Sequence, residues 1–69
     1  MRLSARNVLK GKVVEVTKGA TTARVRIDIG GGNVITASIT NEAVEELRLA
    51  TGDSAYAVIK ASAVMVGKD

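Results

Sequence analysis

The sequence predicts a small all-β domain, a five-stranded barrel with one short helix between its third and fourth strands. The clearest signal is the segment Thr22 to Ile29, in which apolar and polar residues alternate as they do in a half-buried strand. A second signal is Gly30-Gly31-Gly32-Asn33, which separates this segment from another of the same kind. Because the chain has 69 residues, we expect one domain, residues 1–69, with a small core.

Three strands are expected in the first half of the chain. The first covers Lys10 to Thr17, where Gly11 marks a bulge or a close approach of two backbones. The second covers Thr22 to Ile29, with isoleucine, valine and alanine on one face and charged residues on the other. Gly30 to Asn33 forms a hairpin connection, because glycine and asparagine accept a positive φ. The third strand covers Val34 to Thr40.

A short helix follows the third strand. Thr40 or Asn41 can cap its first turn, and Glu42 begins a set of acidic residues at the positive end of the helix dipole. Arg48 falls in the last turn, and Gly52 follows as the expected terminator. With two or three turns and an acidic outer face, this helix is unsuited to reading a nucleic acid.

The last part of the chain supplies two further strands. Ser54 to Lys60 is apolar on both faces, which indicates burial against another subunit in a chain with so few layers. Val64 to Val66 is the short closing strand. Five strands with a helix between the third and the fourth are the layout of a small OB-like barrel.

The composition limits which interactions can stabilise the fold and which partners the chain can bind. There is no cysteine and no histidine, which excludes disulfides and most zinc sites, and Tyr56 is the only aromatic residue. Small aliphatic side chains must therefore fill the core, and we expect self-association to support it. The net charge of +3 and the pI near 9.7 favour anionic partners.

The chain is also expected to be a soluble, cytoplasmic protein. Met1-Arg2-Leu3 is followed by polar residues, so we expect no signal peptide. No apolar run approaches the ~20 residues of a membrane span, so no membrane partner is expected.

Two clusters of hydrogen-bond donors stand out. The first is Ser4-Ala5-Arg6-Asn7, which precedes every acidic residue of the chain, and the second is Lys60-Ala61-Ser62. Each sets a cation beside a hydroxyl, and successive N–H groups at a bend can bind an anion. Taken alone, both clusters are better explained by local side-chain to backbone bonds and turns. Together they favour an anion site.

At this point the sequence resembles a known family, the molbindins or Mop proteins, which bind molybdate and tungstate. Their domain, a Mop or TOBE-like domain, recurs in molybdate-responsive regulators and molybdate transport ATPases. The resemblance covers nearly the whole chain in order and spacing. It is carried by Ser4-Ala5-Arg6-Asn7, Leu9-Lys10-Gly11-Lys12-Val13, Gly31-Gly32-Asn33, Ser38-Ile39-Thr40 and Val58-Ile59-Lys60-Ala61-Ser62-Ala63-Val64-Met65.

The resemblance implies an OB-like fold, a homohexamer built from dimers, and oxyanion sites at subunit interfaces. Donors from one subunit would meet donors from a neighbour around molybdate or tungstate, with no cofactor and no protein ligand to the metal itself. The residues implied are Ser4, Ala5 and Arg6 of one subunit and Thr40, Lys60, Ala61 and Ser62 of the other. The implied role is intracellular storage or buffering of the oxyanion.

Three other functions remain as alternatives. An OB-fold nucleic-acid-binding module would explain the pI, but such grooves stack bases on aromatic side chains and Tyr56 is alone. An enzyme would need a nucleophile and a base, and no clustered pair of that kind is visible without histidine or cysteine. A purely structural assembly module would leave Arg6 and Lys60 without a role in anion binding.

Overall fold

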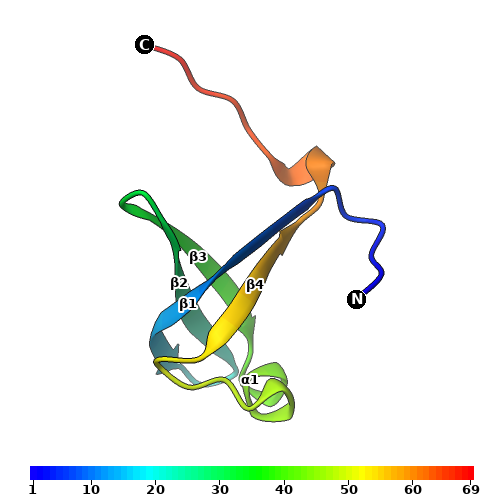
Figure 1. Cartoon of the computed structure of the whole chain (residues 1–69). Helices are drawn as coiled ribbons and strands as arrows, with labels where there is room; N and C mark the ends of the chain where they lie inside the picture. The colour runs from blue at the N-terminus through cyan, green and yellow to red at the C-terminus, as the bar shows by residue number, and fades with distance from the viewer.

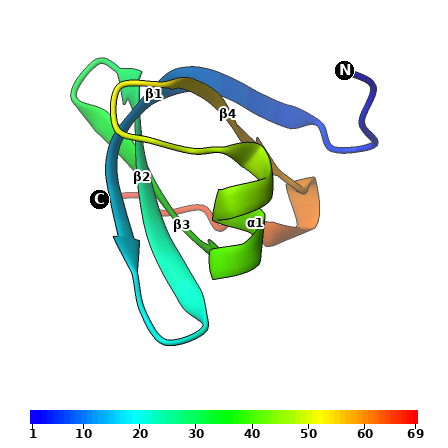
Figure 2. The ribbon, with the colours of Figure 1, turned by 90° about the horizontal axis from the view of Figure 1, so that it is seen from below.

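The computed structural model describes all 69 residues and contains one four-stranded sheet. Every pair of neighbouring strands is antiparallel, and the order across the sheet is β3-β2-β1-β4. The sheet curls into a half-barrel with the helix at one end (Figures 1 and 2). The elements are β1 (Asn7–Lys18), β2 (Thr22–Gly30), β3 (Asn33–Thr40), α1 (Asn41–Leu47), β4 (Ser54–Ile59) and the 3-10 helix η1 (Ala61–Ala63).

The small all-β class, the single helix and its place between β3 and β4 are confirmed. The prediction of a fifth strand is wrong for the isolated chain. Val64 to Val66 has no regular structure and pairs with no other segment. A strand exists only through hydrogen bonds to a neighbouring strand, and this segment runs out beyond the sheet (Figure 1). The expected OB-like barrel is therefore an open half-barrel, with β3 and β4 as its two edges.

β1 is the strand on which the sheet is built, because it pairs with different partners along its two halves. Its first half pairs with β4, from Asn7 opposite Ile59 to Lys12 opposite Ser54. Its second half pairs with β2, from Lys12 opposite Asp28 onwards. The register shifts between Val13 and Glu15, which marks an irregularity of the kind that bends and twists a strand.

Gly11 permits the close approach of β1 to β2. A side chain at this position would collide with the carbonyl oxygen of Asp28, and its Cβ would lie 2.7 Å from Cγ2 of Ile27. The close approach expected from the sequence is therefore confirmed. The glycine hairpin is confirmed as well, since Gly30, Gly31 and Gly32 all have positive φ angles.

The core is small and lies between the concave face of the sheet and α1. As the alternation predicted, Ala23, Val25 and Ile27 of β2 are buried, while Arg24 and Asp28 on the opposite face are exposed. The whole buried set is Val13, Ala23, Val25, Ile27, Val44 and Ala57. Six buried side chains are few for a domain of this length, so one copy alone has little apolar burial to stabilise it.

The convex face of the sheet pairs its charges internally. The Glu15 carboxylate accepts hydrogen bonds from Arg24, the shorter at 2.8 Å, and from the Thr17 hydroxyl at 3.0 Å, and Arg26 lies 3.6 Å away. The hydrogen bond from Arg24, followed by that from Thr17, lowers the pKa of Glu15 below its ordinary value of 4.5. Glu15 thus balances part of the positive charge of these two arginines.

α1 begins as expected and ends earlier than expected. Thr40 is the N-cap, and its Oγ1 accepts a hydrogen bond from the Ala43 N–H at 3.0 Å. The terminator is Arg48 rather than Gly52, because Arg48 takes a left-handed conformation with φ 53°. The N–H groups of Arg48 and Leu49 donate to the carbonyls of Glu45 and Val44, which is a Schellman ending.

We predict that Gly11→Ala lowers the free energy of unfolding by about 1–3 kcal/mol, the usual cost of forcing atoms into a packed site. The reason is the collision with the Asp28 backbone, which cannot move without disturbing the β1–β2 ladder. Chemical denaturation at one fixed protein concentration measures the loss. Gly67→Ala is the control, since nothing lies within 4 Å of a Cβ there. Equal stability of the two variants would contradict the close approach.

Candidate functional site

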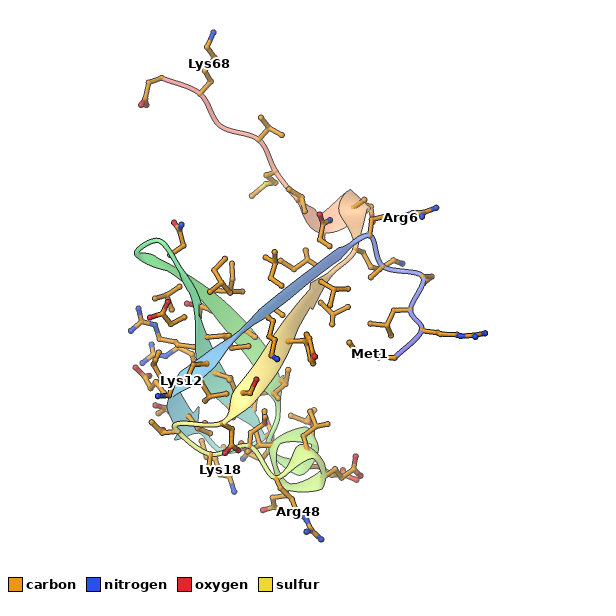
Figure 3. All side chains as sticks on the ribbon, viewed as in Figure 1. Met1, Arg6, Lys12, Lys18, Arg48 and Lys68 are labelled. Carbon is orange, nitrogen blue, oxygen red and sulfur yellow. The ribbon has the colours of Figure 1, made fainter.

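The first donor cluster forms the arm that leads into β1. Ser4 and Arg6 are exposed and Ala5 is half-buried, and β1 begins at the next residue, Asn7. Figure 3 shows Arg6 at the η1 end of the sheet with its side chain directed away from the strands. Its guanidinium can therefore reach a ligand or another molecule.

The second cluster lies where β4 turns into η1. Lys60 is the N-cap of η1 with an extended backbone, φ −62° and ψ 140°, and Ala61 and Ser62 form the first turn. The turn is closed by hydrogen bonds from the Ala63 N–H to the Lys60 carbonyl, 2.9 Å, and from the Val64 N–H to the Ala61 carbonyl, 3.3 Å. The N–H groups of the first turn itself have no acceptor within the helix.

The structure brings these two clusters together. Asn7, the last residue of the first cluster, is paired with Ile59, the residue directly before the second cluster. The Asn7 side chain reinforces this pairing, because its Nδ2 donates a hydrogen bond to the Ile59 carbonyl at 3.2 Å. Two segments more than fifty residues apart in sequence thus lie side by side at one end of the β1–β4 ladder (Figure 1).

Apart from Asn7, the polar side chains of both clusters make no hydrogen bond or ion pair within the chain. The side-chain hydrogen bonds and ion pairs of the chain engage neither the hydroxyls of Ser4 and Ser62 nor the cations of Arg6 and Lys60. This contrasts with Lys18, whose Nζ lies 3.3 Å from Glu45 near α1, at the other end of the sheet. The η1 end therefore offers positive charge and hydroxyl donors without a carboxylate to compete for them.

Thr40 is not part of this group within one chain. It ends β3, pairs with Thr22 at the start of β2, and lies beside α1 at the end of the half-barrel opposite η1 (Figure 1). Its Oγ1 accepts the α1 capping bond, which leaves the hydroxyl hydrogen free to donate. The sequence grouped Thr40 with Lys60, Ala61 and Ser62 on one subunit and placed Ser4, Ala5 and Arg6 on the other. Within one chain, however, Lys60 to Ser62 lie beside Ser4 to Arg6 and at the opposite end of the half-barrel from Thr40, so Thr40 can share a ligand with either cluster only from a second copy.

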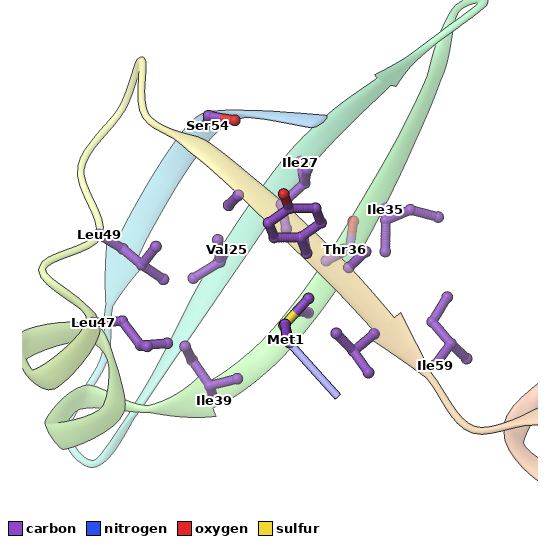
Figure 4. A pocket seen from close by; sticks show the side chains of 15 residues that line it. Met1, Val25, Ile27, Ile35, Thr36, Ile39, Leu47, Leu49, Ser54 and Ile59 are labelled. Carbon is purple, nitrogen blue, oxygen red and sulfur yellow. The ribbon is translucent and has the colours of Figure 1, made fainter. Parts of the chain in front are cut away.

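Two features were not singled out from the sequence as parts of a site. Asn7 was counted in the first donor cluster but not among the residues expected to hold the ligand, and its amide reinforces the β1–β4 pairing that brings the two clusters together. The second feature is an apolar groove of about 670 Å³ on the concave side, which contains none of the predicted site residues (Figure 4). The feature of the sequence that indicates this groove is the predicted strand Ser54 to Lys60, which has apolar residues on both faces.

The chain brings together no group of three or more histidine, cysteine or acidic side chains. None of its helices is long or apolar enough to span a lipid bilayer.

Comparison with known proteins identifies the family to which this chain belongs. The family model described as the TOBE domain matches residues 3–66, so this chain is a TOBE-domain protein. More particularly, it belongs to the molybdenum-pterin-binding proteins, the Mop or molbindin family. The resemblance inferred from the sequence is thereby confirmed, and the family is one of molybdate-binding proteins rather than of enzymes.

Three relatives illustrate the match. A probable molybdenum-pterin-binding protein of Haemophilus influenzae is 57% identical, over 97% of both chains. The structure of MopII from Clostridium pasteurianum superposes with a TM-score of 0.90 at 48% identity, covering 97% of this chain and all of that one. The cytoplasmic molybdate-binding protein ModG, with molybdate bound, gives a TM-score of 0.90 at 52% identity, over 94% of this chain and 46% of ModG.

We predict that Asn7→Ala loosens the η1 end of the sheet while leaving the rest folded. The variant loses one hydrogen bond, which costs about 0.5–1.5 kcal/mol. Hydrogen exchange should therefore accelerate at the amides of Ile59 and Lys60 and stay unchanged at Val25 in the core. Asn33→Ala, at the start of β3 and outside the β1–β4 ladder that ends beside η1, is the matched control. Unchanged exchange at Ile59 in Asn7→Ala would show that the amide does not hold the clusters together.

Proposed function

We propose that this protein binds molybdate or tungstate at the η1 end of the sheet and stores or buffers the oxyanion in the cytoplasm, without chemical turnover. The observation that carries the proposal is the juxtaposition of two donor clusters free of carboxylates, whose polar side chains other than that of Asn7 are uncommitted. The residues proposed to hold the ligand are Ser4, Ala5, Arg6, Lys60, Ala61 and Ser62, with Thr40 from a neighbouring copy.

The chemistry of the ligand matches this set of donors. Molybdate and tungstate are tetrahedral dianions near neutral pH, with four acceptor oxygens and no hydrogen to donate. The hydroxyls of Ser4 and Ser62 and the N–H groups near Ala5 and Ala61 supply donors, while the cations supply charge. Each hydrogen bond to a charged group contributes roughly 1.5–3 kcal/mol, so a few suffice for micromolar affinity after the cost of association.

Self-association belongs to the same proposal. Because Thr40 lies at the end of the chain's half-barrel opposite η1, a ligand that contacts both Thr40 and η1 must bridge two copies. A ligand that binds only the assembled form stabilises it by mass action. We propose a homohexamer, a trimer of dimers, in which OB-like barrels are completed and the oxyanions lie at interfaces.

Sulfate is the competitor that such a site must reject. It has the same shape and charge, so hydrogen-bond donors alone do not discriminate against it. Molybdate and tungstate have longer metal–oxygen bonds, and a cavity fitted to the larger anion would leave sulfate with stretched, weaker hydrogen bonds. Selectivity is thus proposed to come from the size of the cavity formed between copies.

We predict that calorimetry finds tight binding of molybdate and tungstate and much weaker binding of sulfate. Arg6→Gln and Lys60→Gln should each weaken molybdate binding by about 10- to 100-fold, the equivalent of one charged hydrogen bond. Lys12→Gln removes the same charge from an exposed position of β1 outside both clusters and should bind as the unaltered protein does.

Two results would overturn the proposed function. The first is equally weak affinity for all three anions, which would indicate a general electrostatic attraction to a basic protein. The second is unchanged molybdate affinity in both Arg6→Gln and Lys60→Gln, which would place the ligand elsewhere. Light scattering on each variant, at the concentrations used for calorimetry, separates a lost ligand contact from a lost assembly.

A further inference from the structure

Asn41 has a side chain that the capping of α1 does not use. The sequence offered Thr40 and Asn41 as caps, and the structure gives the capping bond to Thr40. The Asn41 side chain instead reaches the β1–β2 turn, where its Nδ2 donates a hydrogen bond to the Gly19 carbonyl at 2.9 Å. Asn41 therefore joins the start of α1 to a different part of the fold.

The backbone of Asn41 contacts the same turn. Its N–H donates to the Thr21 carbonyl at 3.0 Å, and the turn is closed by the Gly19 N–H, which donates to the Thr22 carbonyl at 2.7 Å. Thr40 itself pairs with Thr22 in the β2–β3 ladder. The two bonds from Asn41 to Gly19 and Thr21, here called the Asn41 clamp, thus fix the residue directly after Thr40.

The other polar contact between α1 and this region is weaker. The Lys18 ammonium lies 3.3 Å from the Glu45 carboxylate, but the two side chains are 47% and 70% exposed. An ion pair so open to water adds little stability. The Asn41 clamp is therefore the polar contact that holds the start of α1 against the turn.

Stability alone does not explain an asparagine at this position. Because the Gly19 carbonyl can only accept a hydrogen bond, the NH₂ group of Asn41 must face it. The Oδ1 atom of Asn41 is then buried without a hydrogen-bond partner. A buried carbonyl without a partner is unfavourable, and asparagine forms helices less readily than alanine. Alanine would avoid both disadvantages, which indicates that the clamp serves another purpose.

Thr40 is the residue that the clamp immobilises. Its Oγ1 is held by the Ala43 N–H at 3.0 Å, and the backbone beyond it is held by Asn41. Thr40 is exposed, so its hydroxyl hydrogen can reach a ligand on another copy. A donor whose position is already fixed loses little conformational entropy when it binds.

We propose that Asn41 is a positioning residue for oxyanion binding, because its clamp holds the Thr40 hydroxyl where it donates to a molybdate or tungstate bound by a neighbouring copy. Asn41 itself touches no ligand. The inference rests on the proposed function, which gives Thr40 its ligand contact. It adds a residue outside both donor clusters that determines how strongly this contact is made.

Calorimetry with molybdate on a set of variants tests the inference. Asn41→Ala should weaken binding by about 3- to 10-fold, the equivalent of ordering one more side chain. Its denaturation midpoint should equal that of the unaltered protein. Asn33→Ala is the control, because it makes the same change where the side chain forms no hydrogen bond, and it should bind molybdate normally.

Combination with changes at Thr40 separates positioning from a general structural effect. In Thr40→Val no hydroxyl is left to position, so adding Asn41→Ala should change the affinity by less than about twofold. Thr40→Ser retains the hydroxyl, and in that variant Asn41→Ala should again weaken binding by about 3- to 10-fold.

Hydrogen exchange reports on the clamp without any ligand. Exchange at the Gly19 amide should accelerate by about threefold or more in Asn41→Ala, because one hydrogen bond to the turn is lost, and stay unchanged at Val25 in the core. Asn41→Asp should give the same acceleration. Aspartate retains the shape and suits the first turn of a helix, but its carboxylate has no N–H to donate to Gly19.

Three results would overturn the positioning role while leaving the proposed function intact. The first is molybdate affinity in Asn41→Ala equal to that of the unaltered protein. The second is equal weakening by Asn41→Ala with and without the Thr40 hydroxyl, which would indicate a purely structural effect. The third is unchanged exchange at Gly19 in both Asn41 variants. Absence of molybdate binding by the unaltered protein would instead overturn the proposed function and this inference together.

Discussion

The arrangement of this protein depends on the double pairing of β1. The first half of β1 is hydrogen-bonded to β4 and the second half to β2. Gly11 allows the β1 backbone to lie close to Ile27 and Asp28 of β2. The β1–β4 ladder ends at the pair Asn7 and Ile59, so the segments that flank these two residues must lie side by side. The donor clusters are therefore neighbours as a direct consequence of strand register, and the Asn7 amide adds one bond to hold them there.

The distribution of charge follows from the same architecture. Glu15 is bound to two arginines on the convex face, and the acidic residues of α1 are at the opposite end of the half-barrel. The η1 end is left with cations and hydroxyls that no carboxylate neutralises. An oxyanion can bind there without displacing an internal ion pair, which is why we place the ligand at this end of the sheet and not in the apolar groove.

Much of the fold could be predicted from the sequence, since alternation along β2 and the glycine hairpin specify local structure directly. The left-handed conformation of Arg48 could not be predicted. It accompanies the backbone hydrogen bonds to Val44 and Glu45, and arginine has no intrinsic preference for it. Val64 to Val66 has the pattern of a strand, but a pattern does not say which chain supplies the partner. For the site, each donor cluster was visible in the sequence, whereas their adjacency depends on the β1–β4 register, which the sequence does not state.

The claim that the two clusters share one oxyanion is tested most directly by crystallography with tungstate. Anomalous scattering locates each tungsten atom independently of the protein coordinates. The account predicts a tungstate ion whose oxygens lie within hydrogen-bonding range of both the arm residues Ser4 to Arg6 and the turn Lys60 to Ser62, and also of Thr40 of another copy. Tungsten found only at other positions, or on a single copy without a neighbour, would contradict it.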